Sequence, residues 1–285
     1  MDLKIVATVS VSLLLLVIIK YWLSNNKRQA AKIKLGFRLI EHIQKVISCC
    51  QQHRGISNAI LQGNKSLRTQ LISTQLHLDE LVAEGNILGL KAFPQWESFI
   101  GHWPKLKMHS LERDLTSQNL LRQHNVMVYG HLSLLDELMS EHDLTWIMLG
   151  SSIHMSQLCI DTLKVAETIG QSRAIGSGVC SRGECLGIDK ISLSFLRISI
   201  ISPTNELLTE LSQVEDPVLL SQLTAASKLI KEAVDKLVAT IEDKVLIDGK
   251  IELDAADFFK LATQPIDALN GVYKSLVAHS SRATN

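Results

Sequence analysis

The chain has 285 residues and no net formal charge at neutral pH, with 46% apolar and only 5% aromatic residues. Such a composition can bury a large core and favours helices over sheets. The neutrality hides a segregation, because residues 1–38 hold seven Lys or Arg and one acid, which leaves 22 basic and 28 acidic residues in the body. An acidic body without a basic stripe argues against binding to nucleic acid.

The amino-terminal segment has the pattern of a membrane anchor. Residues 5–19 form an uncharged apolar run, and Lys20, Tyr21, Trp22 and Leu23 extend it to about the 20 residues that cross a bilayer. A cleavable signal peptide would need a basic start and a small-x-small cleavage site, whereas Tyr21 and Trp22 are bulky. We therefore predict a retained transmembrane anchor over residues 1–23.

Charge and cysteine content indicate how the anchor is oriented. Before the apolar run Lys4 is offset by Asp2, whereas several bases follow it, so the positive-inside rule places the carboxyl-terminal side in the cytoplasm. The five cysteines, an odd number that includes Cys49-Cys50, also fit a reducing compartment better than a disulfide framework. The bases after the run are Lys20, Lys27, Arg28, Lys32, Lys34 and Arg38.

Beyond the anchor the first half of the body shows helical periodicity. Apolar residues recur at three- and four-residue steps up to Gly63, which predicts a first helix that continues directly from the anchor. We expect a second helix over residues 66–88 and an irregular aromatic segment around residues 93–104, broken by its prolines. Long helical patterns follow over residues 110–140 and 143–182, the second ending in a left-handed cap at Gly183.

The last third has clearer boundaries. Ser202-Pro203 is expected to end a helix that begins near Ile188, and Asp216-Pro217 reads as an N-cap followed by proline at the first helical position of a helix to about Val245. Asp248-Gly249 indicates a turn, and Asp254 can cap a final helix to Ala278, kinked near Pro265. The sequence predicts an all-α protein of seven or eight helices.

Two short stretches, Gln51–Ser57 and Gly170–Gly176, each set one arginine among glutamine and small residues within an apolar helical pattern. A permanent positive charge is costly to bury without an anion beside it. The planar guanidinium can donate two parallel hydrogen bonds to a planar anion such as nitrate, which the point charge of lysine cannot do. This pair of stretches therefore indicates a small-anion receptor that uses Arg54 and Arg173.

Five motifs occur in order along the chain: Gln51–Ser57, Leu121-Arg122 with Tyr129, Glu167–Ala174, Phe258–Thr263 and Ile266–Leu269. In these motifs the chain resembles the nitrate- and nitrite-sensing (NIT) domain family of bacterial receptors and antiterminators. The resemblance implies an all-helical domain over residues 37–280, built as two four-helix bundles, in which Arg54 and Arg173 bind nitrate or nitrite. Residues 24–36 would then be a basic juxtamembrane segment, and residues 281–285 a tail.

This chain also departs from the family pattern. Family members commonly have glutamate directly before each motif arginine, whereas His53 and Ser172 stand there in this chain. We expect the absence of these two glutamates to remove a competing anion from beside the guanidinium groups. Many relatives continue into an output module, for which we find no room after residue 280. We therefore predict a single-pass protein of the bacterial inner membrane that relays its state to an output protein or through a homodimer.

Two arginines alone do not account for tight binding of an anion. A hydrogen bond to a charged group contributes roughly 1.5 to 3 kcal/mol, and micromolar affinity needs about 8 kcal/mol, so further donors should converge. Structural roles compete with this one: a histidine in this context is more often an interhelical contact, and the glycines can serve close helix packing. The candidate supporting residues are His53, Ser57, Gly170, Gln171 and Gly176.

Other chemistry is weakly indicated. Cys180 and Cys185 could hold zinc only with two further ligands, and no histidine lies close in sequence. Neither a nucleophile elbow nor a phosphate loop is found, so we expect no enzyme, no metal site and no cofactor. Two alternatives to the sensor stay open: a membrane-tethered helical scaffold without ligand binding, and a redox sensor using Cys49, Cys50, Cys180 or Cys185.

Overall fold

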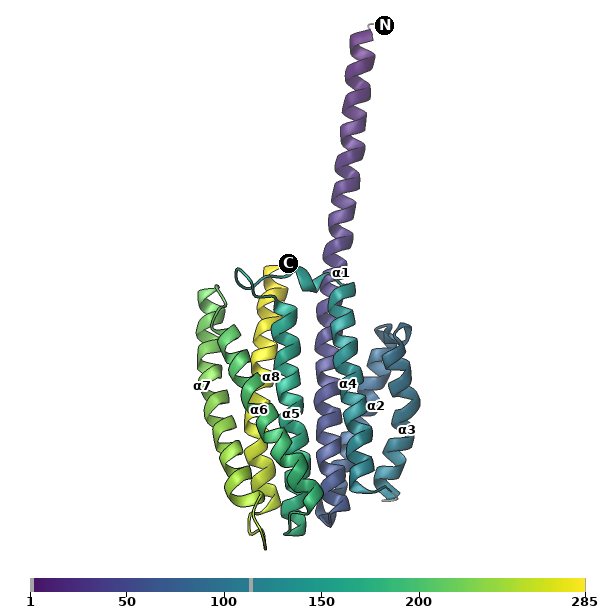
Figure 1. Cartoon of the computed structure of the whole chain (residues 1–285). Helices are drawn as coiled ribbons and strands as arrows, with labels where there is room; N and C mark the ends of the chain where they lie inside the picture. The colour runs from purple at the N-terminus through teal and green to yellow at the C-terminus, as the bar shows by residue number, and fades with distance from the viewer. Residues whose placement is uncertain (1–2, 113–114, 285) are drawn as a thin grey trace.

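The computed structural model describes residues 3–112 and 115–284, with side chains from residue 20 onward. This part of the chain is predominantly helical and contains no β-strand, so the predicted all-α class is confirmed. Short 3₁₀ turns lie at Lys65–Leu67, Leu90–Ala92 and Leu144–Trp146, and a π-helical turn at Ile241–Val245. The α-helices, shown in Figure 1, are α1 (Leu3–Leu61), α2 (Arg68–Ile87), α3 (Pro94–Glu112), α4 (Ser117–Glu141), α5 (Met155–Arg182), α6 (Gly187–Leu211), α7 (Pro217–Thr240) and α8 (Ala255–Ala283).

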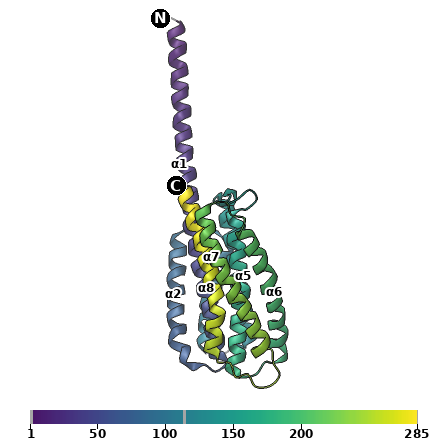
Figure 2. The same ribbon diagram turned by 90° about the vertical axis from the view of Figure 1, so that its left-hand side faces the viewer.

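The helices form two groups of four that lie side by side. The part of α1 after residue 35 packs with α2 and α4, and α3 packs on α4; in the second group α5 and α8 form the main pair, with α6 and α7 outside them. The groups meet where α1 and α4 contact α5, and one hydrophobic core runs through both. Figures 1 and 2 show α1 projecting far beyond the other helices.

In the described part of the chain, no helix is long and apolar enough to span a membrane. The predicted anchor at residues 1–23 falls mostly on residues 1–19, whose side chains lie outside the described set. Tyr21 and Trp22, expected at a membrane interface, are 75% and 60% exposed.

Local signals at several helix ends act as predicted. Asp216 accepts a hydrogen bond from the main-chain N–H of Leu219, and Asp254 accepts from Ala256 and Asp257, so both cap the following helix. Gly183 ends α5 with φ of 77°, a left-handed conformation that costs glycine little.

Two prolines expected to break helices lie inside them instead. Pro104 is within α3 and Pro203 within α6, which corrects the irregular segment predicted around residues 93–104 and the boundary predicted at Ser202-Pro203. In each helix the buried stripe continues past the proline, and its burial offsets the lost hydrogen bond. The buried residues are Trp96, Phe99, Trp103 and Leu106 in α3, and Leu196, Ile200, Thr204 and Leu207 in α6.

The helix predicted over residues 143–182 begins later than expected. Asp143 has φ of 59°, which interrupts helical geometry, and an antiparallel bridge joins Met148 to His154 before α5 starts at Met155. The connection from α4 to α5 is therefore a folded loop at one end of the molecule.

Candidate functional site

Arg54 lies on the side of α1 that faces the second helical group, and its side chain is completely buried. Its two terminal nitrogens donate to the two carboxylate oxygens of Glu167 on α5, at 2.5 Å from Nη1 to Oε1 and 3.0 Å from Nη2 to Oε2. Nη1 also donates to Oδ1 of Asn125 on α4, at 2.7 Å. This forked contact is the strongest way for a guanidinium to bind a planar anion.

Glu167 is as deeply buried as Arg54, with 0% of its side chain exposed. Besides the two bonds from Arg54, its carboxylate accepts a hydrogen bond from Gln51 Nε2 at 2.9 Å and one from Gln171 Nε2 at 2.9 Å. Four N–H groups from α1 and α5 therefore surround one carboxylate. A buried ion pair needs such a full set of partners to offset the loss of hydration.

A polar path leads from this carboxylate toward the surface. Gln171 also donates to the hydroxyl oxygen of Tyr129 on α4, at 3.1 Å, and the Tyr129 side chain is 53% exposed. The supporting role predicted for Gln171 is thus compatible with its position, although its partner here is Glu167. Because Gln171 contacts both Glu167 and the half-exposed Tyr129, it lies between the buried carboxylate and solvent.

Arg173, one and a half turns after Glu167 on α5, has a different environment. Its side chain is 5% exposed, its Nη1 donates to the hydroxyl of Thr263 on α8 at 2.9 Å, and its guanidinium carbon lies 4.6 Å from the ring centroid of Phe259. Among the described residues it forms no ion pair with a carboxylate, and its Nε has no hydrogen-bond partner. Burial lowers the pKa of Arg173 to about 10, and the charge of Arg54 contributes to the lowering.

The two arginines share one neighbourhood at the junction of the helical groups. A Cβ placed on Gly170 would lie 2.8 Å from Nη2 of Arg54, and one placed on Gly55 would lie 3.2 Å from the Phe259 ring that carries Arg173. The absence of side chains at both glycines lets α1 approach α5 and α8 closely around the charged groups. The structure therefore brings together the two arginines that the sequence singled out.

Gly176 has a packing role. A Cβ there would lie 2.2 Å from the buried ring of Phe258, so the glycine makes room for an aromatic side chain of α8. It does not contact either arginine through any recorded interaction. Helix packing thus accounts for a glycine at this position, and the predicted role in supporting the anion stays a prediction.

His53 points away from the arginines, into the first helical group. Its Nδ1 lies 2.7 Å from Nε2 of His124, and its Nε2 lies 3.1 Å from Nε2 of Gln75. The His124 Nδ1 lies 2.8 Å from the carbonyl of Leu120, so a chain of neutral imidazoles satisfies these contacts. Burial lowers the pKa of both histidines, that of His124 to about 3. His53 is an interhelical residue in this arrangement.

Two buried hydroxyl groups near the arginines have no hydrogen-bond partner among the described residues. They belong to Ser57, one turn after Arg54 on α1, and to Ser172, directly before Arg173 on α5. A buried polar atom without a partner costs free energy, and such atoms are uncommon in native proteins. Both hydroxyls are available to a further group.

The main residue that sequence reasoning missed is Glu167. It belongs to the motif Glu167–Ala174, but no role was assigned to it, and the expectation that the guanidinium groups lack a competing anion is wrong for Arg54. A signal was present, because Glu167 and Gln171 are four residues apart and share a helix face with apolar neighbours. Asn125 gave no such signal, since its role depends on how α4 packs against α1.

The cysteines show no sign of reactivity. All five are reduced and buried. Burial raises the pKa of Cys49 and of Cys180 to about 12, so their thiols stay protonated at neutral pH and are poor nucleophiles. The described residues also contain no group of three or more His, Cys, Asp or Glu side chains arranged to hold a metal ion. The redox alternative thus gains no support from geometry.

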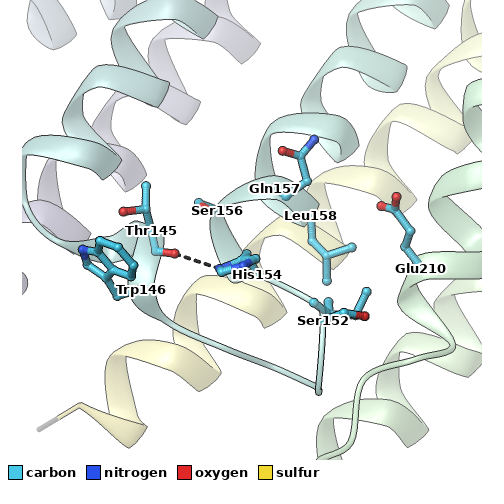
Figure 3. A pocket seen from close by; sticks show the side chains of 9 residues that line it. Thr145, Trp146, Ser152, His154, Ser156, Gln157, Leu158 and Glu210 are labelled. Atoms are coloured by element: carbon cyan, nitrogen blue, oxygen red, sulfur yellow. Dashed lines mark hydrogen bonds between the residues drawn. The ribbon is translucent and has the colours of Figure 1, made fainter.

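The main surface clefts lie elsewhere. Figure 3 shows one of about 410 Å³, between the loop before α5 and the end of α6, lined by residues that include Trp146, His154 and Glu210. His154 lies 3.0 Å through Nδ1 from the carbonyl oxygen of Thr145 (Figure 3). None of the five clefts described for this chain is lined by Arg54 or Arg173. The arginine site is closed in this conformation, because the Arg54 side chain is fully buried and that of Arg173 is only 5% exposed.

Comparisons with known proteins place the fold but not the family. No family model matches the chain, and no curated protein matches it. Among solved structures, the NasR transcription antiterminator is similar, with a TM-score of 0.68 and 15% sequence identity over 94% of this chain and 74% of that one. At this identity the similarity shows a shared helical fold.

Proposed function

We propose that this protein is a sensor of nitrate or nitrite, with the anion bound between the two helical groups by Arg54 and Arg173. The proposal is supported by the sequence resemblance to the nitrate- and nitrite-sensing family, which includes antiterminators, and by the fold shared with one antiterminator. The observation that carries it is the forked pair of Arg54 and Glu167 beside a second buried arginine that forms no ion pair with any carboxylate in the described part of the chain.

The Glu167 carboxylate is a chemical stand-in for the ligand. Carboxylate, nitrite and nitrate are planar, carry one negative charge, and present two oxygens at similar spacing to a guanidinium fork. Four donors already surround that place: two N–H groups of Arg54 and the side-chain amides of Gln51 and Gln171. In the closed conformation the protein thus supplies its own anion, and a free anion must compete with it.

Arg173 provides the reason for an external anion to enter. A buried guanidinium that has one neutral hydrogen bond and one aromatic contact is incompletely compensated, and its lowered pKa reflects this cost. An anion shared by Arg54 and Arg173 would neutralise the second charge. The hydroxyls of Ser57, one turn after Arg54, and of Ser172, directly before Arg173, have no partner among the described residues and are candidate additional donors. In this scheme Glu167 turns outward, along the path marked by Gln171 and Tyr129.

Exchange of Glu167 for a free anion would change the contact between the helical groups. Arg54 and Asn125 come from α1 and α4, whereas Glu167, Arg173 and Thr263 come from α5 and α8. A ligand shifts such an equilibrium only by its differential affinity for the two arrangements. Nitrate or nitrite would favour the arrangement in which both arginines face the anion.

We further propose that residues 1–23 anchor the protein in a membrane with residues 24–285 on the cytoplasmic side, as the charge distribution indicates. The helical body would then report its state to a partner protein.

The test is a titration of the 285-residue chain, in mild detergent, with the sodium salts of nitrate, nitrite, chloride and sulfate. A ligand present at about 100 times its dissociation constant stabilises the folded state by about 2.7 kcal/mol. We expect nitrate or nitrite at millimolar concentration to raise the unfolding temperature, and chloride and sulfate at matched ionic strength to do so far less. Equal effects of all four salts, or none, would refute the sensor.

A scaffold without ligand binding is the second candidate, and one observation favours it. Arg54 already has a complete ion pair, so its role could be to join α1 to α5. The two candidates differ in their response to anions and in the effect of removing the internal carboxylate. In a scaffold, replacement of Glu167 only destabilises; in a sensor, it also exposes a binding site.

A further inference from the structure

Helix α6 carries an apolar stripe on its outer face that no other element of the described chain covers. Five large apolar side chains on this helix are 39–70% exposed, although the helix buries an opposite face against α5 and α7. Isolated exposed apolar residues are common, but a continuous stripe over four turns marks an interaction surface. The α6 stripe consists of Ile188, Ile191, Phe195, Ile198 and Ile201.

The spacing of the α6 stripe is that of a coiled-coil seam. Ile188, Ile191, Phe195 and Ile198 follow one another at steps of three, four and three residues, which is the a/d pattern of a heptad. Ser192, Ser199 and Ser202 lie beside or along the stripe, and these small side chains let a second helix approach closely. The pattern suits a helix that packs along the full length of α6 at a shallow angle.

Electrostatic repulsion does not oppose contact between the α6 stripes of two copies of the chain. The bases next to the stripe are neutralised within the chain, because Lys190 is bonded to Asp248 and Arg197 to Glu242. A twofold interface brings each surface residue close to its own copy, so an unpaired charge would meet a like charge there. This stripe has none, which fits a second copy of the chain better than a charged partner.

The area available is of the size that a modest dimer needs. A fully exposed large apolar side chain offers roughly 100 to 200 Å², and the five exposures together equal about three full side chains, so the stripe offers on the order of 300 to 600 Å² per copy. Stable interfaces bury about 800 Å² per partner and weak ones less than about 600 Å². With the intervening serines the α6 stripe reaches the range of a reversible dimer.

We propose that two copies of this chain associate through their α6 stripes, side by side and in parallel. The helices α1 and α6 run along the same long axis of the molecule (Figures 1 and 2), so parallel α6 helices leave both α1 helices projecting in one direction. Each position of the stripe then meets the same position of the other copy. This interface is separate from the arginine site and does not depend on anion binding.

Cysteine cross-linking in the 285-residue chain tests this geometry. The variants Ile188→Cys, Ile191→Cys and Ile198→Cys should each form a disulfide-linked dimer under a mild oxidant. The five native cysteines are buried, so the unmodified chain is the blank, and Leu229→Cys on the exposed side of α7 is the matched control. Cross-links at one end of the stripe only, or at none of the three positions, would overturn the parallel dimer.

Disruption of the stripe gives a second, independent readout. Phe195→Glu places two like charges at the centre of the proposed seam and should weaken dimerisation at least about tenfold in sedimentation equilibrium. Leu229→Glu, an equally exposed apolar position on α7, should dimerise like the unmodified chain. Circular dichroism checks that both variants are folded. A monomeric unmodified chain at about 100 µM, or a dimer that Phe195→Glu leaves intact, would refute the proposal.

Discussion

The guanidinium of Arg54 and the carboxylate of Glu167 form a forked ion pair with neither side chain exposed, between helices of different groups. Such a pair is costly to break from one side, because an isolated buried charge then stays behind. Under the proposed function, we expect the charge left behind on Arg54 to bind a planar anion that reaches it.

The first prediction concerns Glu167→Gln. Glutamine keeps the size of the side chain but removes its charge, so we expect the free energy of unfolding to fall by about 3 kcal/mol without added anion. Nitrate or nitrite should then restore a large part of the loss, and their stabilising effect should exceed that in the unmodified chain. Urea unfolding with and without each salt measures both quantities.

The control for this variant is Glu232→Gln on the exposed face of α7, which should change neither stability nor the anion response. If Glu167→Gln is destabilised and no anion restores it, Arg54 and Glu167 are a structural pair and the scaffold gains support.

The second prediction concerns Arg173→Met. Methionine removes the buried charge together with one hydrogen bond and one aromatic contact, so these effects offset and stability without anion should change by at most about 1 kcal/mol. Stabilisation by nitrate or nitrite should disappear, as calorimetric titration would show. Arg182→Met, on the same helix but paired with Asp189, should keep the anion response. An unchanged anion affinity in Arg173→Met would remove Arg173 from the site.

The third prediction contrasts two glycines. Gly176→Ala would set a methyl group 2.2 Å from the buried Phe258 ring, so we expect a loss of about 1 to 3 kcal/mol. Gly271→Ala in α8 meets no atom within 4 Å and should gain up to about 1 kcal/mol from its better helix propensity. Thermal unfolding of both variants would show the opposite signs, and a neutral Gly176→Ala would contradict the close packing of α5 on α8.

The fourth prediction concerns pH. Burial lowers the pKa of His124 and of His131 to about 3, whereas an unfolded histidine titrates near 6.5. Between these values the unfolded chain binds more protons than the folded chain, so stability falls as the pH drops below about 6.5. The expected loss from pH 7 to pH 5.5 is about 1 kcal/mol for each such histidine, measured by urea unfolding at the two pH values.

His131→Leu isolates one contribution to this pH dependence. Both ring nitrogens of His131 are buried without a partner, against Phe99 at 4.4 Å between ring centroids. Leucine should therefore raise stability at pH 5.5 and reduce the pH-dependent loss by about 1 kcal/mol. His77→Leu, at an exposed position of α2, should leave the pH dependence as it is. An unaltered pH dependence in His131→Leu would mean that this ring is not buried in its neutral form.

Periodicity and capping residues predicted the helices well where the signal is local. Asp216, Asp254 and Gly183 mark helix ends because each acts through its own backbone neighbours. The helix breaks predicted at Pro104 and Pro203 were wrong. The cost of an internal proline is local and visible in the sequence, whereas the burial that offsets it comes from contacts with distant helices. A single sequence shows the cost but not the offset.

For the candidate site, too, the sequence indicated the residues that stand out locally but not their distant partners. Arg54 and Arg173 stand out in sequence because a permanent charge in an apolar pattern needs an explanation, and the structure places them in one neighbourhood. Their partners could not be assigned from the sequence, since Glu167 and Asn125 lie 113 and 71 residues from Arg54 along the chain. Which carboxylate meets which guanidinium depends on how the helical groups dock.

The unbroken course of α1 from Leu3 to Leu61 makes this helix a lever. Arg54 lies near one end, and at 1.5 Å per residue Lys20 is about 50 Å away along the same rod. A tilt of about 5° at the level of Arg54 would displace the far part of the helix by about 4 Å, a distance comparable to one helical turn. If the proposed exchange of the Glu167 carboxylate for an anion tilts α1 in this way, the projecting part of the helix moves far enough to change its contact with a neighbouring molecule.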